Sequence, residues 1–149
     1  MNLEKFYKVF IKQGLEPVLT KTIGKYFWPP CSVAVLAEGD HEDILVLDEG
    51  RHYGLPGGII KAGEDPKSTG RREVKEETGF EVEVGNLLDI KTSSDGDSGI
   101  HFFFKGKVIR GTKNGSWEGQ PEFIEKKEVN DKVWKPGHSH VHEYLFPND

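Results

Sequence analysis

The sequence is poor in the features that crosslink a chain or hold it in a membrane. Cys31 is the only cysteine among 149 residues, so no disulfide can form within the chain. It begins an apolar run, and we interpret it as a small buried residue, because free cysteines are commonly buried. No apolar run approaches the about 20 residues that cross a bilayer, and the first residues show no hydrophobic block of a signal peptide. We therefore expect a cytoplasmic protein without a membrane partner.

An excess of positive charge is also lacking. The chain has 20 Lys and Arg against 25 Asp and Glu, a formal net charge of -5. Sequence-independent binding to nucleic acid depends on a basic surface, so we expect no stable nucleic-acid partner. A small anionic substrate remains compatible with this charge, because a bound metal ion inverts the local charge of an acidic site.

The order of expected elements indicates one α/β domain over residues 1–149. The length suits a single hydrophobic core, and no repeat or linker divides the sequence. Helical spacing of apolar residues predicts a short amphipathic helix near residues 3–11. Apolar runs bounded by turn residues predict strands, and the mixture predicts an α/β sandwich. The strands are expected at 32–37, 44–47, 53–55, 81–92, 100–110 and 123–129, with a polar turn at 93–99 and a short closing helix or strand at 141–146.

The clearest local pattern is a helix expected at residues 66–78. Asp65 is a suitable N-cap residue, and Pro66 fits the first helical position, where its missing N–H costs nothing. Gly79 fits the left-handed position that ends many helices. Gly70 inside the helix costs about 1 kcal/mol relative to alanine, which a close contact with the sheet would explain.

Carboxylates of this helix are spaced to bind a divalent cation. Glu73, Glu76 and Glu77 have the spacing i, i+3, i+4 and share one helix face. Hard oxygen ligands suit Mg²⁺ or Mn²⁺, whose charge removes the repulsion among the carboxylates. Arg72 stands at i, i+4 from Glu76 and can hold it by a bidentate pair, while Gly58 lets the backbone come close to the helix. The alternative interpretation is a solvated helix with ordinary Glu–Arg pairs.

The segment from Gly58 to Phe80 resembles the Nudix box, G-x5-E-x7-R-E-U-x-E-E-x-G-U, in which U is a bulky hydrophobic residue. Phe80 places an aromatic side chain at the last hydrophobic position, a mild departure from the pattern. The other fixed positions are filled by Gly58, Glu64, Arg72, Glu73, Val74, Glu76, Glu77 and Gly79.

The resemblance implies the Nudix fold, an α/β/α sandwich with a mixed β-sheet, and hydrolysis of a phosphoanhydride bond in a nucleoside diphosphate derivative. It implies that Glu73, Glu76 and Glu77 bind Mg²⁺ or Mn²⁺ and that Gly58 shapes a loop whose backbone adjoins the metal. Arg72 would orient the carboxylates, and Glu64 would either bind the metal indirectly or hold the loop in shape. A homodimer is compatible with this family.

The general base implied by the resemblance is a glutamate of the box, Glu76 or Glu77, or a glutamate of a later loop. Residues 117–122, WEGQPE, resemble a loop of MutT-like members of the family. That similarity makes Glu118 the candidate base of the later loop. The alternative is a turn with a solvated glutamate.

The substrate has to be inferred from residues outside the box. The EGQP loop and the small size slightly favour nucleoside triphosphates, with ADP-ribose or another nucleotide sugar as the alternative. Arg51, Tyr53 and Trp117 are candidate substrate contacts because of their positions near the loops. A non-catalytic nucleotide-binding module is the alternative of another class, although the intact charged positions of the box count against it. An isoprenoid diphosphate isomerase is disfavoured, because that chemistry requires a reactive cysteine and Cys31 lies far before the box.

The histidine-rich run GHSHVH is assigned no role in the magnesium chemistry. His138, His140 and His142 would share one face at strand spacing, which makes a transition-metal site conceivable. Packed or solvated histidines are the favoured interpretation.

Overall fold

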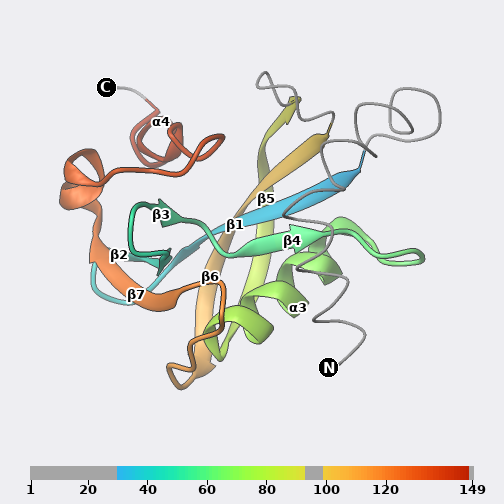
Figure 1. The fold of residues 1–149 in the computed structure, drawn as a ribbon, viewed down its shortest axis with the longest axis horizontal. Coiled ribbons are helices and arrows are strands. Elements are labelled where there is room, and N and C mark those ends of the chain that lie inside the picture. The colour runs from blue at the N-terminus through green and yellow to red at the C-terminus, as the bar shows by residue number, and fades with distance from the viewer. Residues whose placement is uncertain (1–29, 93–98, 148–149) are drawn as a thin grey trace.

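The computed structural model describes residues 30–92 and 99–147, which form a mixed sheet with helices on both faces (Figure 1). The helix expected near residues 3–11 and nearly all of the turn expected at 93–99 lie outside the described residues. None of the described helices is long and apolar enough to cross a membrane.

Strand β1 (Cys31–Glu38) forms the centre of the sheet. It runs parallel to β6 (Ile100–Gly111) and antiparallel to β2 (Asp43–Asp48) and β4 (Gly57–Ile59). The strands expected at 32–37 and 44–47 are thus present as β1 and β2 and pair with each other. A strand that is covered on both faces is mostly apolar, and β1 is apolar and buried from Val33 to Ala37.

The remaining strands extend both sides of this centre. β5 (Phe80–Thr92) pairs antiparallel with β6, while β3 (Tyr53–Gly54) and β7 (Gln120–Glu125) both pair antiparallel with β2. The main path through the sheet is β3-β2-β1-β6-β5. The expected mixed sheet is confirmed by this combination of parallel and antiparallel pairs.

Helix α3 (Pro66–Thr78) covers one face of the sheet. Val33 and Val35 of β1 point to this face and pack in one buried cluster with Val74 of the helix. A Cβ atom on Gly70 would lie 2.9 Å from Cγ2 of Val35, so the close contact expected for this glycine is present.

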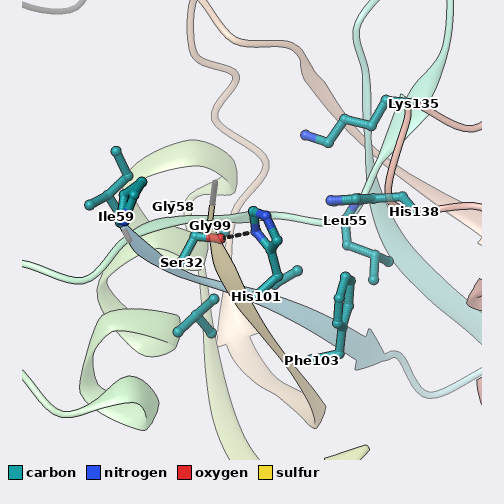
Figure 2. Close-up of a pocket in the computed structure, with 13 residues that line it drawn as sticks. Ser32, Leu55, Gly58, Ile59, Gly99, His101, Phe103, Lys135 and His138 are labelled. Carbon is teal, nitrogen blue, oxygen red and sulfur yellow. Dashed lines mark hydrogen bonds between the residues drawn. The ribbon is translucent and has the colours of Figure 1, made fainter. Parts of the chain in front are cut away.

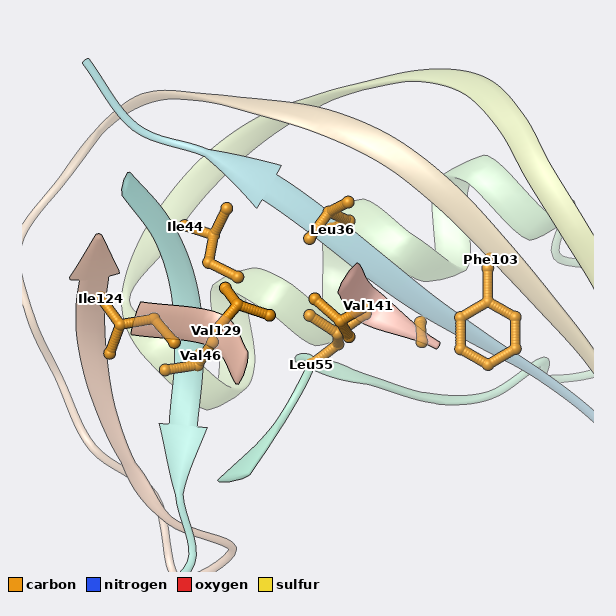
Figure 3. Packing of buried hydrophobic residues seen from close by; sticks show 9 residues of the cluster. Leu36, Ile44, Val46, Leu55, Phe103, Ile124, Val129 and Val141 are labelled. Carbon is orange, nitrogen blue, oxygen red and sulfur yellow. The ribbon is translucent and has the colours of Figure 1, made fainter. Parts of the chain in front are cut away.

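The opposite face is covered by the 3₁₀ helix η3 (Lys126–Asp131) and by α4 (Val141–Leu145). Their buried side chains meet those of the sheet in a second cluster (Figure 3). The two covered faces confirm the α/β/α sandwich. The buried members of this cluster are Ala34, Leu36, Ile44, Val46, Leu55, Phe103, Ile124, Val129 and Val141.

The predicted ends of α3 are confirmed by its capping geometry. The Asp65 carboxylate accepts a hydrogen bond from the Ser68 N–H at 3.0 Å, which satisfies a free donor of the first turn. Gly79 has φ = 80° and ends the helix in the left-handed conformation. Both signals act within one turn of chain, which explains why the sequence was sufficient to place them.

Two expectations require correction. The strand expected at 123–129 ends at Glu125, because the Lys126 N–H bonds to the Glu42 carbonyl and the chain then turns into η3. Val129 is buried beneath the sheet through this turn. Cys31 is half-buried, because it is the first residue of β1 and lies at the end of the strand.

Candidate metal and catalytic site

Strand β4 brings its glycines directly against the carboxylates of α3. The Gly57 N–H donates a hydrogen bond to Oε2 of Glu77 at 2.8 Å. A Cβ atom on Gly58 would lie only 2.5 Å from Cδ of Glu73, so any larger residue would displace that carboxylate. The short β4 strand is therefore held close to the acidic face of the helix, as the sequence predicted.

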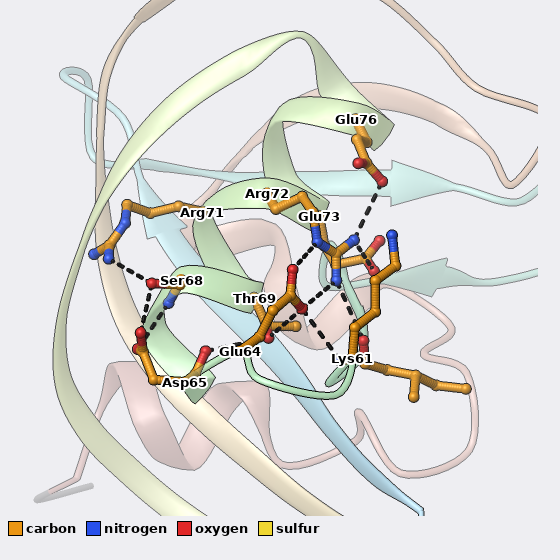
Figure 4. Close-up of polar contacts among 10 residues, drawn as sticks. Lys61, Glu64, Asp65, Ser68, Thr69, Arg71, Arg72, Glu73 and Glu76 are labelled. Carbon is orange, nitrogen blue, oxygen red and sulfur yellow. Dashed lines mark hydrogen bonds and ion pairs between the residues drawn. The ribbon is translucent and has the colours of Figure 1, made fainter.

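Arg72 links the loop before α3 to the acidic helix face (Figure 4). Its Nε and Nη2 atoms donate to the two oxygens of Glu64 at 2.6 and 2.8 Å, and its Nη1 donates to Glu73 at 2.6 Å. The bond to Arg72 is the main cause that lowers the pKa of Glu64 to about 2, and the same bond raises the pKa of Arg72. Glu64 also accepts from Thr69 Oγ1 at 2.9 Å. These contacts support the interpretation of Glu64 as a residue that holds the loop.

Glu76 lies at the open side of the site. Its side chain is 52% exposed and contacts Nη1 of Arg72 at 3.3 Å. The i, i+4 contact expected between these two residues is present, although the geometry is weaker than the paired bonds to Glu64. Arg72 thus holds three carboxylates, and two of them belong to the predicted metal-ligand set.

Glu77 is the buried member of the set, with 5% of its surface exposed. Burial raises the pKa of its carboxyl to about 9, and a hydrogen bond to Glu118 and the negative charges of Glu118 and Glu73 act in the same direction. A buried carboxylate beside a second one is costly unless a proton or a cation neutralises the pair. Glu118, the candidate base of the EGQP loop, is therefore in contact with Glu77 of the box.

The donor set fits a hard divalent cation. The charges of Glu73 and Glu118 both act on the buried Glu77 carboxylate, and Mg²⁺ or Mn²⁺ prefers carboxylate oxygens. Over residues 30–92 and 99–147, no group of three or more His, Cys, Asp or Glu side chains is converged as a ready metal site. Glu73 and Glu76 are held in ion pairs with Arg72.

A pocket of about 300 Å³ opens beside this site (Figure 2). Gly57 and Gly58 line it and also contact the metal-site carboxylates, so the two regions are continuous. The rest of its wall comes from β1, β6 and the segment before α4. The remaining lining residues are Pro30, Ser32, Val33, Ala34, Leu55, Ile59, Gly99, His101, Phe103, Lys135 and His138.

Comparison with known proteins decides the family. The model of the NUDIX domain matches residues 28–145, which is most of the chain. This protein belongs to the Nudix family. The fold and the box geometry described above agree with that assignment.

Individual Nudix relatives differ in what they are named for. The chain is 31% identical to the methanol dehydrogenase activator of Bacillus methanolicus over 108 residues, covering 67% of this chain and 58% of that protein. It is 30% identical to the ADP-ribose pyrophosphatase of Methanocaldococcus jannaschii over 103 residues, covering 66% and 61%. The crystal structure of a MutT protein from Bacillus halodurans matches with a TM-score of 0.64 and 26% identity, covering 80% and 84%. The chain thus spans about three fifths of the length of both curated relatives.

The substrate contacts predicted for this Nudix protein do not line the pocket. Tyr53 packs against the cluster beneath the sheet, with the Lys132 ammonium 5.0 Å from its ring centroid. Arg51 is exposed in the turn before β3, and Trp117 is 61% exposed beside Glu118. Their roles remain predictions.

Sequence reasoning missed the polar residues that do line the pocket. Ser32, His101 and Lys135 come from separate parts of the chain, and no local spacing relates them. His138 belonged to the histidine-rich run, but only the fold shows that it turns into the pocket while His140 and His142 contact Glu143 and Phe146. The interpretation of these histidines as packed or solvated holds for all three, because His138 packs edge-on against Phe103; what the sequence did not indicate is that His138 also lines the pocket.

Proposed function

We propose that this Nudix protein hydrolyses a phosphoanhydride bond in a nucleoside diphosphate derivative. Glu73, Glu76 and Glu77 are the proposed ligands of Mg²⁺ or Mn²⁺, beside the backbone of Gly58. The observation that carries the proposal is the buried Glu77 carboxylate next to that of Glu118, with the charge of Glu73 nearby. Such a group of carboxylates is stabilised by a divalent cation, and that cation can also hold diphosphate oxygens.

The protein side chains would divide the work as follows. A bound divalent cation supplies charge neutralisation for the diphosphate and lowers the pKa of a nearby water. The Gly57 N–H fixes Glu77, and Arg72 orients Glu73 and Glu76 through ion pairs. Glu118 is the proposed acceptor for the proton of the attacking water, and its interaction with the buried Glu77 carboxylate supports this role. Glu76 and Glu77 are the alternative bases within the box.

Nucleoside triphosphates are the slightly favoured substrates, because the EGQP loop resembles that of MutT-like members, and the interaction of its Glu118 with the buried Glu77 supports this choice. ADP-ribose is the second candidate, and the 30% identity to an ADP-ribose pyrophosphatase supports it. Both candidates have a diphosphate joined to a nucleoside. They differ in the group on the far side of the bond, so product analysis separates them.

The test is a panel of nucleoside triphosphates, ADP-ribose and nucleotide sugars, incubated with Mg²⁺ and analysed for every product. The variants are Glu77→Gln and Glu118→Gln, with Glu125→Gln as the control because that glutamate is exposed and paired with Lys127. Wild type and the control should release a nucleoside monophosphate from at least one compound, and both site variants should be slower by about a hundredfold or more.

Two outcomes would overturn the proposal. Tight binding of a nucleotide without any turnover would favour the non-catalytic binding module. Turnover that is equally fast in Glu77→Gln would place the chemistry away from these carboxylates.

A further inference from the structure

The pocket beside the proposed metal site is positioned to hold the nucleoside that is attached to the diphosphate. Gly57 and Gly58 form part of its wall, and the same glycines touch Glu77 and Glu73. A substrate whose diphosphate lies at the carboxylates would therefore extend its nucleoside along this wall. The inference developed below deepens the proposed function and depends on it for the position of the diphosphate.

The polar wall of the pocket is built by a short segment that β3 holds in place. The Tyr53 N–H donates to the Val133 carbonyl at 2.8 Å, and the Lys135 N–H donates to the Tyr53 carbonyl at 2.9 Å. The chain then turns, and the His138 N–H donates to the Lys135 carbonyl at 3.0 Å. These backbone bonds fix Lys135 and His138 on the same side of the pocket.

His138 presents a hydrogen-bond donor with a fixed tautomer. Its Nδ1 atom accepts from the Leu55 N–H at 2.9 Å, so this nitrogen carries no proton. Burial, helped by the nearby Lys135 charge, lowers the pKa of His138 to about 3, which keeps the ring neutral. The single ring proton is therefore on Nε2, which is free to donate. The ring packs edge-on against Phe103, with 5.8 Å between centroids, and points into the pocket (Figure 2).

Lys135 adds a second donor beside the imidazole. Its ammonium group is held by Glu49 at 2.9 Å and keeps two further protons for a ligand. On the opposite wall, Ser32 Oγ and His101 Nδ1 bond to each other at 2.5 Å. No Asp, Glu, Asn or Gln side chain occurs among the lining residues in the described part of the chain.

This arrangement favours ligand atoms that accept hydrogen bonds. The remaining wall is apolar, with Ala34, Leu55 and Phe103, and such a surface suits a flat heterocycle. A ring carbonyl oxygen can take the protons of His138 and Lys135. An exocyclic amino group at the same place would face two donors and lose its water without a replacement, which is unfavourable.

We propose that His138 and Lys135 determine the specificity of this protein and select nucleotides whose base carries a carbonyl oxygen at purine C6 or pyrimidine C4. Guanine and uracil carry a carbonyl oxygen there, whereas adenine and cytosine carry an amino group at the corresponding position. The two residues act on binding of the base, while the carboxylates of α3 act on the diphosphate.

The test measures binding rather than turnover. Methylene-bridged nucleoside diphosphates of guanosine, uridine, adenosine and cytidine are titrated calorimetrically into the protein with Mg²⁺. The variants are His138→Asn, which keeps an acceptor for the Leu55 N–H and removes the Nε2 donor, and Lys135→Met, which keeps the aliphatic stem. His140→Asn is the control, because this histidine is outside the pocket and bonds to Glu143.

Wild type and the control should bind the guanosine and uridine compounds about tenfold more tightly than the other two. His138→Asn and Lys135→Met should each remove about tenfold of affinity for the carbonyl-bearing pair and leave the amino-bearing pair within about twofold. Equal binding of all four compounds by wild type would overturn the inference. An equal loss for all four in His138→Asn would show a purely structural role and would also overturn it.

The binding titrations and the hydrolysis panel together separate this inference from the proposed function. Selective binding without hydrolysis of any compound in the panel would leave the specificity residues standing and reject the catalytic proposal. Hydrolysis of a panel compound together with equal binding of all four methylene-bridged compounds would reject the specificity residues and leave the catalytic proposal standing.

Discussion

Replacement of Glu77 by glutamine should stabilise the metal-free protein, and the gain should grow as pH rises. The pKa of this carboxyl is about 9 in the fold against 4.5 in an unfolded chain. A raised folded-state pKa stabilises the fold most at low pH, and that contribution is lost as pH rises toward the folded value. Glutamine can still accept the hydrogen bond from the Gly57 N–H and carries no charge, so the variant should not lose this contribution to stability as pH rises.

The size of the effect follows from the one proton that the folded state retains. Between pH 6.5 and pH 8.5, the wild-type free energy of unfolding should fall by up to about 1.4 kcal/mol per pH unit relative to the variant. For a chain of this length, 1 kcal/mol corresponds to about 3 °C in Tm, so the difference between the two proteins should widen by about 4 °C per pH unit.

The assay is thermal unfolding in EDTA at pH 6.5, 7.5 and 8.5, with Glu125→Gln as the exposed control. Mg²⁺ is then added, and it should raise the Tm of wild type by the equivalent of about 2.7 kcal/mol at a hundred times its Kd, with a much smaller rise in Glu77→Gln. A difference between variant and wild type that stays constant with pH would refute the reasoning. A lower Tm for Glu77→Gln at pH 8.5 would refute it as well.

Other predictions concern the loop, the glycines and the buried histidine. Arg72→Lys removes the bidentate bond to Glu64 and should lower kcat/KM about tenfold to a hundredfold, measured at saturating Mg²⁺. The methyl group of Gly58→Ala would meet the end of the flexible Glu73 side chain, so this variant should weaken Mg²⁺ binding in a calorimetric titration with little change of Tm in EDTA. The methyl group of Gly57→Ala would meet the backbone of Val33, so this variant should lower Tm by several degrees. Because the pKa of His138 is lowered to about 3, wild type should lose stability as pH falls from about 6.5, and His138→Asn should show a weaker loss in acid unfolding curves.

The sequence predicted best what is decided within one turn of chain. The caps Asp65 and Gly79 depend on residues three or four apart and are present as expected. Arg72 does contact Glu76 four residues away, but through Nη1 only, and the bidentate pair that the sequence suggested is made with Glu64 instead. The end of β7 was placed too late, because the turn into η3 depends on a backbone bond to Glu42, far away in sequence.

The candidate site shows the same division between local and distant contacts. Helical spacing was sufficient to group the carboxylates of α3. The loop similarity singled out Glu118 as a candidate base, but its interaction with Glu77 is seen only in the fold, because the two residues are far apart in the sequence. Neither helical spacing nor the loop similarity predicted the pocket. Its wall depends on the pairing of residues 133–135 with β3, which sets His138 opposite β6, and no pattern along the chain encodes that pairing.

The most direct test of the central claim is the rate of hydrolysis of the best panel substrate as a function of Mg²⁺ concentration, for wild type, Glu77→Gln and Glu125→Gln. We predict a saturable dependence of the rate on Mg²⁺ concentration for wild type and the control. At every Mg²⁺ concentration, the rate of Glu77→Gln should be lower than that of wild type by about a hundredfold or more. Hydrolysis that persists in EDTA, or a Glu77→Gln rate equal to that of wild type, would contradict the account.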